Sequence, residues 1–251
     1  MIKIVVSGAR GKMGKAVTEL IRKEQDMEVI AGYDTCSEAG DIVVYNDLHK
    51  IPHIPDVIVD FSHPSAIRQL AEYAAMKGVA LAVGTTGLGE EHKEMLLKTS
   101  QKVPVFVSHN MCLGVFLLMN LARQAAKVLG DFDIEIVEKH HNQKIDAPSG
   151  TALMIADGIK EIRQEADYIY CRADVRKKRE KREIGIHSIR GGNIVGEHTV
   201  LLIGENESIE LTHKITSRQV LAAGAVNVIR YIAQQKPGYY TMKDLVNANL
   251  N

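Results

Sequence analysis

Residues 1–110 alternate between short apolar runs and segments of helical character, and this alternation limits the possible folds more than any other feature. The apolar runs span 2–6, 27–33, 57–61, 79–83 and 103–107, and the helical segments between them span 15–23, 64–77 and 89–100. Parallel strands need long crossover connections, which helices usually supply. The sequence therefore predicts an α/β fold with an N-terminal Rossmann-like parallel sheet covered by helices on both faces.

The pattern changes after residue 110. Helical segments at 114–129 and 149–163 flank a strand-like segment at 132–139, and further strand-like segments follow at 184–190, 194–203 and 208–215. Short turns join the last three, which favours antiparallel pairing of consecutive strands. We predict a C-terminal α+β domain, residues 112–217, with a mixed or antiparallel sheet. The first domain would combine residues 1–111 with 218–251, because the apolar face of the helical segment 219–235 should pack back on it.

Composition argues against several classes of protein. Lys plus Arg and Asp plus Glu both total 31, and a net charge of zero argues against a general nucleic-acid or anionic-membrane binder. The apolar stretch 115–122 is far shorter than the ~20 residues of a membrane span. Cys36, Cys112 and Cys171 are odd in number and widely spaced, which favours a reducing compartment over a disulfide framework. The chain begins with a strand-like run, so we expect no signal peptide and a cytoplasmic location.

Two basic features lie outside the predicted catalytic site. The segment 172–183 is rich in Lys and Arg, but acidic residues interrupt it and no aromatic residues interleave for base stacking. A solvated loop or helix is therefore the better interpretation. Arg218 stands where the chain should return to the first domain, and it is either a structural contact or a substrate contact. We leave it out of the predicted catalytic site.

A glycine-spaced turn joins the first strand to the first helix. Gly8, Gly11 and Gly14 are spaced GxxGxxG, and such glycines let backbone N–H groups approach a pyrophosphate at the helix N-terminus. Asp34 lies 20 residues after Gly14, at the end of the second strand, where a carboxylate can bind the adenine ribose hydroxyls. The other interpretation is a tight turn and a strand-end carboxylate without a ligand. The surrounding strand and helix pattern favours a dinucleotide site.

Asp34 also bears on the choice of cofactor. A carboxylate repels the 2′-phosphate of NADPH, so NADH should be used well. Arg10 and Lys12 lie in the glycine turn and could partly offset this repulsion. The sequence therefore predicts NADH and/or NADPH as cofactor.

Two further loops end strands at the same predicted sheet edge. Gly84-Thr85-Thr86-Gly87 and Ser108-His109-Asn110-Met111 are small or polar, so they leave room for a ligand and can bind it. Taken alone, the first of them is equally explained as a structural turn. A second small or polar loop at the end of the next strand favours the interpretation that both loops bind a ligand.

The stretch 138–152 carries the densest set of reactive side chains. His140 and His141 are adjacent at a strand end, so they should point to opposite faces. Lys144 could bind a substrate carboxylate or donate a proton, and the helix start 149–151 could bind an anion. The alternative is a polar strand end followed by an N-cap serine. We expect no metal, because no HExxH, cysteine pair or third ligand accompanies the histidines.

The same stretch resembles a known motif. The string His140-His141-x-x-Lys144-x-Asp146-Ala147-Pro148-Ser149-Gly150-Thr151-Ala152 resembles the defining motif of the bacterial 4-hydroxy-tetrahydrodipicolinate reductase family. Other stretches match in the family's order: Gly8-Ala9-x-Gly11-Lys12-Met13-Gly14, Asp60-Phe61-Ser62, Gly84-Thr85-Thr86-Gly87, Ile194-Val195-Gly196-Glu197-His198 and Thr212-His213-Lys214-x-x-Ser217-Arg218. The resemblance covers the whole chain.

The resemblance implies roles for individual residues. His140 is similar to the family's general acid/base, and Lys144 to its proton donor and carboxylate partner. The implied substrate contacts are His141, Gly150 and Thr151. The implied cofactor contacts are Gly8, Ala9, Arg10, Gly11, Lys12, Met13, Asp34, Gly84, Thr85, Thr86, Ser108, His109, Asn110 and Met111.

The resemblance also implies a reaction and an assembly. A nicotinamide would reduce the cyclic imine formed when 4-hydroxy-tetrahydrodipicolinate loses water, giving tetrahydrodipicolinate for lysine and diaminopimelate biosynthesis. The substrate is a small dicarboxylate, and the family forms homotetramers through the sheet of the second domain. We expect two domains to close so that His140 and Lys144 meet the nicotinamide. Cys112 and Phe116 replace polar residues of the family's hinge.

Two other functions remain compatible with the sequence. One is an NAD(H)-binding sensor of the same fold with little turnover, for which the changed hinge is the only support. The other is a Rossmann reductase of a different imine or aldehyde. Activity on monocarboxylates would indicate the latter.

Overall fold

The computed structural model describes residues 1–217 and 219–250. The chain divides into two compact units, which we call unit 1 (Met1–Leu113 and Gln219–Asn251) and unit 2 (Gly114–Arg218). Arg218 itself lies outside the described residues. The domain roles predicted above remain predictions.

Unit 1 contains a seven-stranded sheet in the order β12-β6-β5-β4-β1-β2-β3. All of its strand pairs are parallel, which confirms the predicted Rossmann-like sheet. The strands are β1 (Ile2–Ser7), β2 (Met27–Tyr33), β3 (Val44–Tyr45), β4 (Val57–Asp60), β5 (Ala80–Val83), β6 (Pro104–Val107) and β12 (Gly238–Tyr240). The strands β3 and β12 were not predicted, since strands of two and three residues are too short to show a period.

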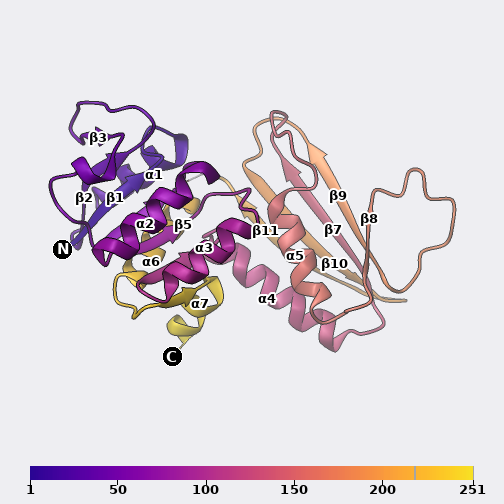
Figure 1. The fold of residues 1–251 in the computed structure, drawn as a ribbon. Helices are drawn as coiled ribbons and strands as arrows, with labels where there is room; N and C mark the ends of the chain where they lie inside the picture. The colour runs from indigo at the N-terminus through magenta and orange to yellow at the C-terminus, as the bar shows by residue number, and fades with distance from the viewer. Residues whose placement is uncertain (218, 251) are drawn as a thin grey trace. The chain divides into compact units, whose positions relative to one another are not determined.

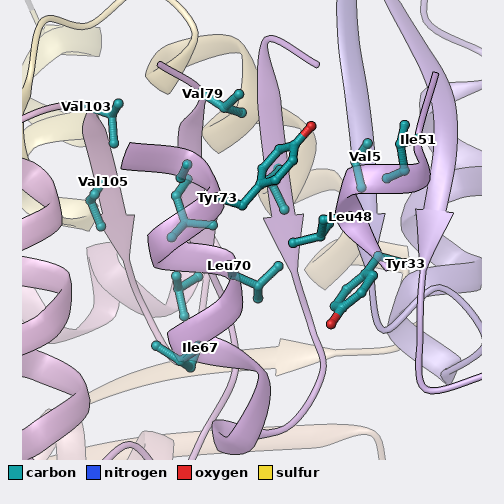
Figure 2. Close-up of a cluster of buried hydrophobic side chains, with 14 of the residues drawn as sticks. Val5, Tyr33, Leu48, Ile51, Ile67, Leu70, Tyr73, Val79, Val103 and Val105 are labelled. Atoms are coloured by element: carbon teal, nitrogen blue, oxygen red, sulfur yellow. The ribbon is translucent and has the colours of Figure 1, made fainter. Parts of the chain in front are cut away.

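Helices cover both faces of this sheet (Figure 1). They are α1 (Lys12–Ile21), α2 (Ile67–Lys77), α3 (Glu90–Ser100), α6 (Gln219–Ile232) and α7 (Met242–Leu250), with short 3-10 helices η1 (Leu48–Lys50) and η2 (Pro64–Ala66). Figure 2 shows α2 packing Leu70 and Tyr73 into the core beside the sheet. As predicted, α6 returns to unit 1, where it contacts α1 and the strands β4 to β6.

The strand order places a topological switch point at β1. The chain continues from β1 to β2 on one side, whereas β4 pairs with the other side of β1. Ser7 and Asp60, the last residues of β1 and β4, are register partners. In open α/β sheets, ligands bind outside the carboxyl ends of the strands at such a point.

Unit 2 contains a five-stranded sheet in the order β11-β10-β7-β9-β8. Its strands are β7 (Asp133–His140), β8 (Asp167–Tyr170), β9 (Glu183–Arg190), β10 (Gly196–Ile203) and β11 (Ser208–Ile215), and its helices are α4 (Leu113–Val128) and α5 (Gly150–Lys160). The sheet is mixed, within the predicted class, because β7 pairs with β9 in parallel and with β10 antiparallel.

One expectation about unit 2 is wrong. The short turn after β9 was expected to join two paired antiparallel strands, but β7 lies between β9 and β10. The connection crosses the end of β7, where Gly191 N–H donates to His140 O (3.0 Å) and Asn142 N–H donates to Gly192 O (3.2 Å). Turn composition does not reveal whether a turn skips a strand. The crossing matters because it holds the backbone around His140.

The basic segment 172–183 is an irregular loop whose charges are mostly paired. Arg179 contacts Asp133 (2.6 Å) and Glu135 (3.0 Å), and Arg172 contacts Glu183. These ion pairs leave little free positive charge, in agreement with the surface-loop interpretation. Within residues 1–217 and 219–250, no helix is long and apolar enough to cross a membrane.

Candidate active site

The turn after β1 requires its glycines. Gly8 has φ +73°, and a Cβ there would lie 2.4 Å from the carbonyl oxygen of Phe61. A Cβ at Gly14 would lie 2.2 Å from the carbonyl oxygen of Gly8. The helix α1 starts after Gly11, which has no capping side chain, so its first N–H groups can bind an anion. This cradle, which a Cβ would fill, fits the pyrophosphate of a dinucleotide.

Asp34 is attached to this turn. Its Oδ2 accepts the N–H of Arg10 (3.0 Å), and its Oδ1 accepts the N–H of Thr35 (2.8 Å). The guanidinium of Arg10 pairs with Glu38 (2.9 Å). The structure therefore brings together the predicted residues Gly8, Ala9, Arg10, Gly11, Lys12 and Asp34.

The remaining predicted cofactor residues line one cavity of about 250 Å³ in unit 1. Its lining residues are Met13, Phe61, Ser62, Gly84, Thr85, Thr86, Ser108, His109, Asn110, Met111 and Leu221. A Cβ at Gly84 would lie 2.3 Å from the ring of Phe61, which explains glycine at that position. The loops after β5 and β6 thus converge at the edge of the sheet where the sequence placed them.

A buried carboxylate, Asp60, underlies this cavity. It is fully buried and accepts hydrogen bonds from the hydroxyls of Ser7 (2.7 Å), Ser62 (2.5 Å) and Thr85 (2.6 Å). Burial raises the pKa of Asp60, and the three hydroxyls offset part of that effect. Thr85 also accepts the N–H of Ser62 (2.9 Å), so its side chain is used inside the protein. The sequence analysis assigned no role to Asp60.

In unit 2, a second buried carboxylate holds His140. Glu138 is fully buried, and its Oε2 lies 2.6 Å from Nδ1 of His140. Arg190 donates to both oxygens of Glu138, at 2.8 and 2.7 Å. Burial acts to raise the pKa of Glu138, but hydrogen bonds from His140 and Arg190 outweigh it and hold the pKa well below its usual value. Glu138 is therefore ionised at neutral pH.

The start of α5 is attached to the same carboxylate. Ser149 N–H donates to Oε1 of Glu138 (3.2 Å), while its hydroxyl accepts the N–H of Ala152 (3.2 Å) as an N-cap. The Ser149 hydroxyl also lies 3.1 Å from Nε2 of His198. Burial, together with the nearby His140, lowers the pKa of His198 to about 4, so His198 is neutral at neutral pH.

The predicted substrate residues lie around this helix start. Gly150 and Thr151 form the first turn of α5, and a Cβ at Gly150 would meet open space. His141 is half-buried, and its carbonyl accepts the N–H of Lys144 (3.1 Å). A tight turn thus connects the end of β7 to Lys144.

Lys144 is held by a short chain of contacts to Arg190. Its Nζ donates to Oδ1 of Asp146 (2.7 Å), and Arg190 donates to the carbonyl of Asp146 (2.7 Å). The hydrogen bond from Lys144 holds the pKa of Asp146 below its usual value. His140, Lys144 and the start of α5 are therefore linked through Glu138 and Arg190.

Glu138, Arg190 and His198 were missed as members of this cluster. Glu138 stands two residues before His140, so strand alternation places both on one face. Arg190 is 50 residues from His140 in sequence (190 − 140) and reaches it only because β7 and β9 pair in register. The described part of the chain contains no group of three or more His, Cys, Asp or Glu side chains placed to hold a metal ion.

Comparison with known proteins identifies one family over both units. The family model described as "Dihydrodipicolinate reductase, N-terminus" matches residues 2–111, and "Dihydrodipicolinate reductase, C-terminus" matches residues 114–246. A 4-hydroxy-tetrahydrodipicolinate reductase of Caldanaerobacter subterraneus is 47% identical over 98% of each chain. One of Methanocaldococcus jannaschii is 39% identical over 99% of this chain and 98% of its own.

A solved structure is similar over nearly the full length. Dihydrodipicolinate reductase from Paenisporosarcina sp. TG-14, described as bound to dipicolinate, superposes with a TM-score of 0.80. It is 26% identical and covers 96% of this chain and 97% of its own. Together, the glycine turn, the His140 cluster and these full-length matches show that the chain belongs to the dihydrodipicolinate reductase family.

Proposed function

We propose that the chain reduces the dehydrated cyclic imine of 4-hydroxy-tetrahydrodipicolinate to tetrahydrodipicolinate, with a hydride from NADH or NADPH, in lysine and diaminopimelate biosynthesis. The observation that carries the proposal is the cluster in unit 2, where His140, Lys144 and the start of α5 are joined through one buried carboxylate. Relatives that match over the full chain bear the name of this activity.

Unit 1 would hold the cofactor. The turn Gly8 to Met13 would bind the pyrophosphate through backbone N–H groups, and Asp34 would accept the adenine ribose hydroxyls. The cavity lined by Gly84 to Thr86 and Ser108 to Met111 would receive the nicotinamide end. When bound, the nicotinamide supplies a hydride to the conjugated ring of the imine.

Unit 2 would hold the dicarboxylate and supply the proton. Lys144 and the N-terminus of α5 at Gly150 and Thr151 would bind the substrate carboxylates, with His141 as a further contact. Hydride addition leaves negative charge on the ring, which a proton must neutralise. His140 would supply that proton, because an imidazole changes charge near neutral pH. The relative described as bound to dipicolinate, an aromatic dicarboxylate, supports this substrate class.

The charges around Asp34 favour NADH. The carboxylates of Asp34 and Glu38 lie next to the glycine turn, and Arg10 is already paired with Glu38. A 2′-phosphate would have to compete for Arg10 and approach both carboxylates. We therefore propose that NADH is the better cofactor and that NADPH is also accepted.

A homotetramer in the cytoplasm completes the proposal. The side chains of Ile189 and Ile203 are exposed by 46% and 39%, although both lie on strands of the sheet in unit 2. Apolar side chains on an open sheet face favour burial against other copies of the chain. Light scattering of the purified protein would test the tetramer.

Steady-state oxidation of each cofactor with the freshly generated imine precursor tests the proposed function. NADH and NADPH would be compared by their near-ultraviolet absorbance, and we expect saturable oxidation with both and a higher kcat/KM with NADH. Saturable binding of NADH without oxidation would instead indicate a sensor. Equal activity on monocarboxylate imines would indicate a different reductase.

A further inference from the structure

A buried ion pair lies beneath the reactive cluster of unit 2, and the proposed reaction leaves it without a role. Glu138 is fully buried at the end of β7, and Arg190 contacts it from the neighbouring strand β9. We propose that Glu138, clamped by Arg190, is a positioning residue that fixes the tautomer and orientation of His140 and holds Lys144 and α5 in place around the substrate. This inference rests on the proposed function.

The carboxylate determines which nitrogen of His140 exchanges protons. Ionised Glu138 can only accept hydrogen bonds, so Nδ1 of His140 must carry a hydrogen and donate it across the 2.6 Å contact. Nε2 is then the nitrogen that takes up and releases a proton. It faces Gly196, where a Cβ would lie 3.3 Å away, so the absence of a side chain there leaves room for the ring.

Arg190 keeps the carboxylate in a single orientation. Its two terminal nitrogens donate to the two oxygens of Glu138, a geometry that fixes the carboxylate plane. Arg190 also donates to the carbonyl of Asp146, and the carboxylate of Asp146 accepts a hydrogen bond from Lys144. The same guanidinium therefore helps to hold Lys144 in position. Moving the ion pair would therefore misplace both proposed proton donors together.

The helix start depends on the other oxygen of Glu138. Oε1 accepts the N–H of Ser149, which is the N-cap of α5. The carboxylate that holds the imidazole therefore also fixes the position of the proposed anion-binding turn. The groups that face His140 are thus Glu138 on its own strand, Arg190 on β9, and His198 on β10, whose ring centre lies 5.2 Å from that of His140. Burial keeps His198 neutral, so the charge in direct contact with the imidazole is that of Glu138.

Glu183 provides a matched control. It is also buried, with 3% of its surface exposed, and it also pairs with an arginine, Arg172. It begins β9, whereas Arg190 ends that strand, so it lies at the opposite end of the sheet from His140. Glu183→Gln should reproduce the loss of a buried ion pair without affecting the imidazole.

The experiment compares Glu138→Gln, Glu138→Asp and Glu183→Gln in the full chain. Mutation of the carboxylate that orients a metal-binding histidine typically lowers activity by about 10 to 100-fold, and we use the same scale for a carboxylate that orients a catalytic histidine. We expect Glu138→Gln to lower kcat by that factor, with KM for the imine changed less and NADH affinity unchanged. The alkaline limb of its pH profile should move to lower pH, because the imidazolium loses its negative partner. Glu138→Asp should recover part of kcat, and Glu183→Gln should stay within about twofold of the wild type.

A second measurement does not depend on activity. Nitrogen-15 NMR of the wild-type protein should show neutral His140 with its hydrogen on Nδ1, and Arg190→Gln should weaken that preference. A hydrogen on Nε2 in the wild type would overturn the proposal even if the protein failed to reduce the imine. So would Glu138→Gln and Glu183→Gln variants with equal thermal stability, equal kcat and the same pH profile. A wild type with the Nδ1 tautomer but no imine reduction would refute the proposed function and leave Glu138 as the residue that orients His140.

Discussion

Each unit buries one carboxylate completely beneath its proposed ligand site, and the two are held in opposite ways. Asp60 of unit 1 is surrounded by hydroxyl donors, and burial raises its pKa. Glu138 of unit 2 is held by a guanidinium and an imidazole, which keep its pKa well below the usual value. The hydroxyl donors orient the Asp60 carboxylate but do not balance its charge. Arg190 both orients the Glu138 carboxylate and balances its charge.

This difference separates two kinds of site. The cavity of unit 1 is lined mostly by hydroxyl and apolar side chains, together with Gly84, His109 and Asn110, and no charged pair is among its described lining residues, which suits a large ligand that must be placed but not protonated. The cluster of unit 2 is built from paired charges around an imidazole, which suit proton transfer to a dianionic substrate. Substitutions in each unit should therefore have different effects.

The largest expected effect follows from replacing His140. His140→Ala should lower kcat by about 10² to 10⁴-fold, the usual contribution of general acid–base catalysis. The affinity for NADH should stay within about twofold, because the proposed cofactor residues all belong to unit 1. Steady-state kinetics and a fluorescence titration with NADH measure the two quantities. A large loss of NADH affinity would show that the division between the units is wrong.

The two buried carboxylates should differ in their contribution to stability. Glu138→Gln leaves the charge of Arg190 uncompensated in a mostly buried site and should lower the free energy of unfolding by about 3 kcal/mol. Asp60→Asn should lower it by only about 1 kcal/mol, because the amide oxygen still accepts from Ser7 and Ser62, one hydrogen bond from Thr85 is lost, and no cation is left unpaired. Denaturant unfolding at neutral pH compares them. Equal losses would mean that the hydroxyls of unit 1 support the charge as well as Arg190 does in unit 2.

Removing the half-buried carboxylate of Asp34 beside the glycine turn should change the cofactor preference. Asp34→Ser should raise the ratio of NADPH to NADH kcat/KM by about tenfold, since one charge near the 2′-phosphate is removed. Asp41→Ser is the control, because Asp41 is exposed and makes only a long contact of 3.8 Å to Arg22. An unchanged ratio in Asp34→Ser would rule out the proposed ribose contact.

The smallest expected effect concerns how the folding stability depends on pH. The contributions of Asp60 and Glu138 to stability should change with pH in opposite directions. The folded-state pKa of Asp60 is raised above 3.8, so its contribution is present below that pH and is lost as pH rises. The folded-state pKa of Glu138 is lowered below 4.5, so its contribution is present above that pH and is lost as pH falls. Relative to the wild type, Asp60→Asn should therefore become more stable as the pH rises above 3.8 toward neutrality. Unfolding curves across that range check the sign, and a falling relative stability would contradict it.

The parallel sheet and the groups of reactive side chains could be predicted from the sequence, because both depend on residues that are close together along the chain. Residues 8–14 combine glycine spacing with a strand and a helix, and residues 140–152 form one continuous motif. Arg190 could not be predicted, since its contact with Glu138 depends on the register of β7 and β9. The position of β7 between β9 and β10 could not be predicted for the same reason, because strand pairing across a sheet is a property of the whole fold.

Isotope labelling tests most directly whether NADH supplies the hydride and His140 the proton, because it follows hydrogen atoms from cofactor and solvent into the product. With NADH deuterated at the nicotinamide carbon that donates hydride, the wild type should form tetrahydrodipicolinate carrying one deuterium, and unlabelled NADH in heavy water should place one solvent deuterium on the ring. His140→Ala should form that product far more slowly while binding NADH normally. Saturated NADH with no deuterium in the product, or labelling at an undiminished rate in His140→Ala, would contradict the account.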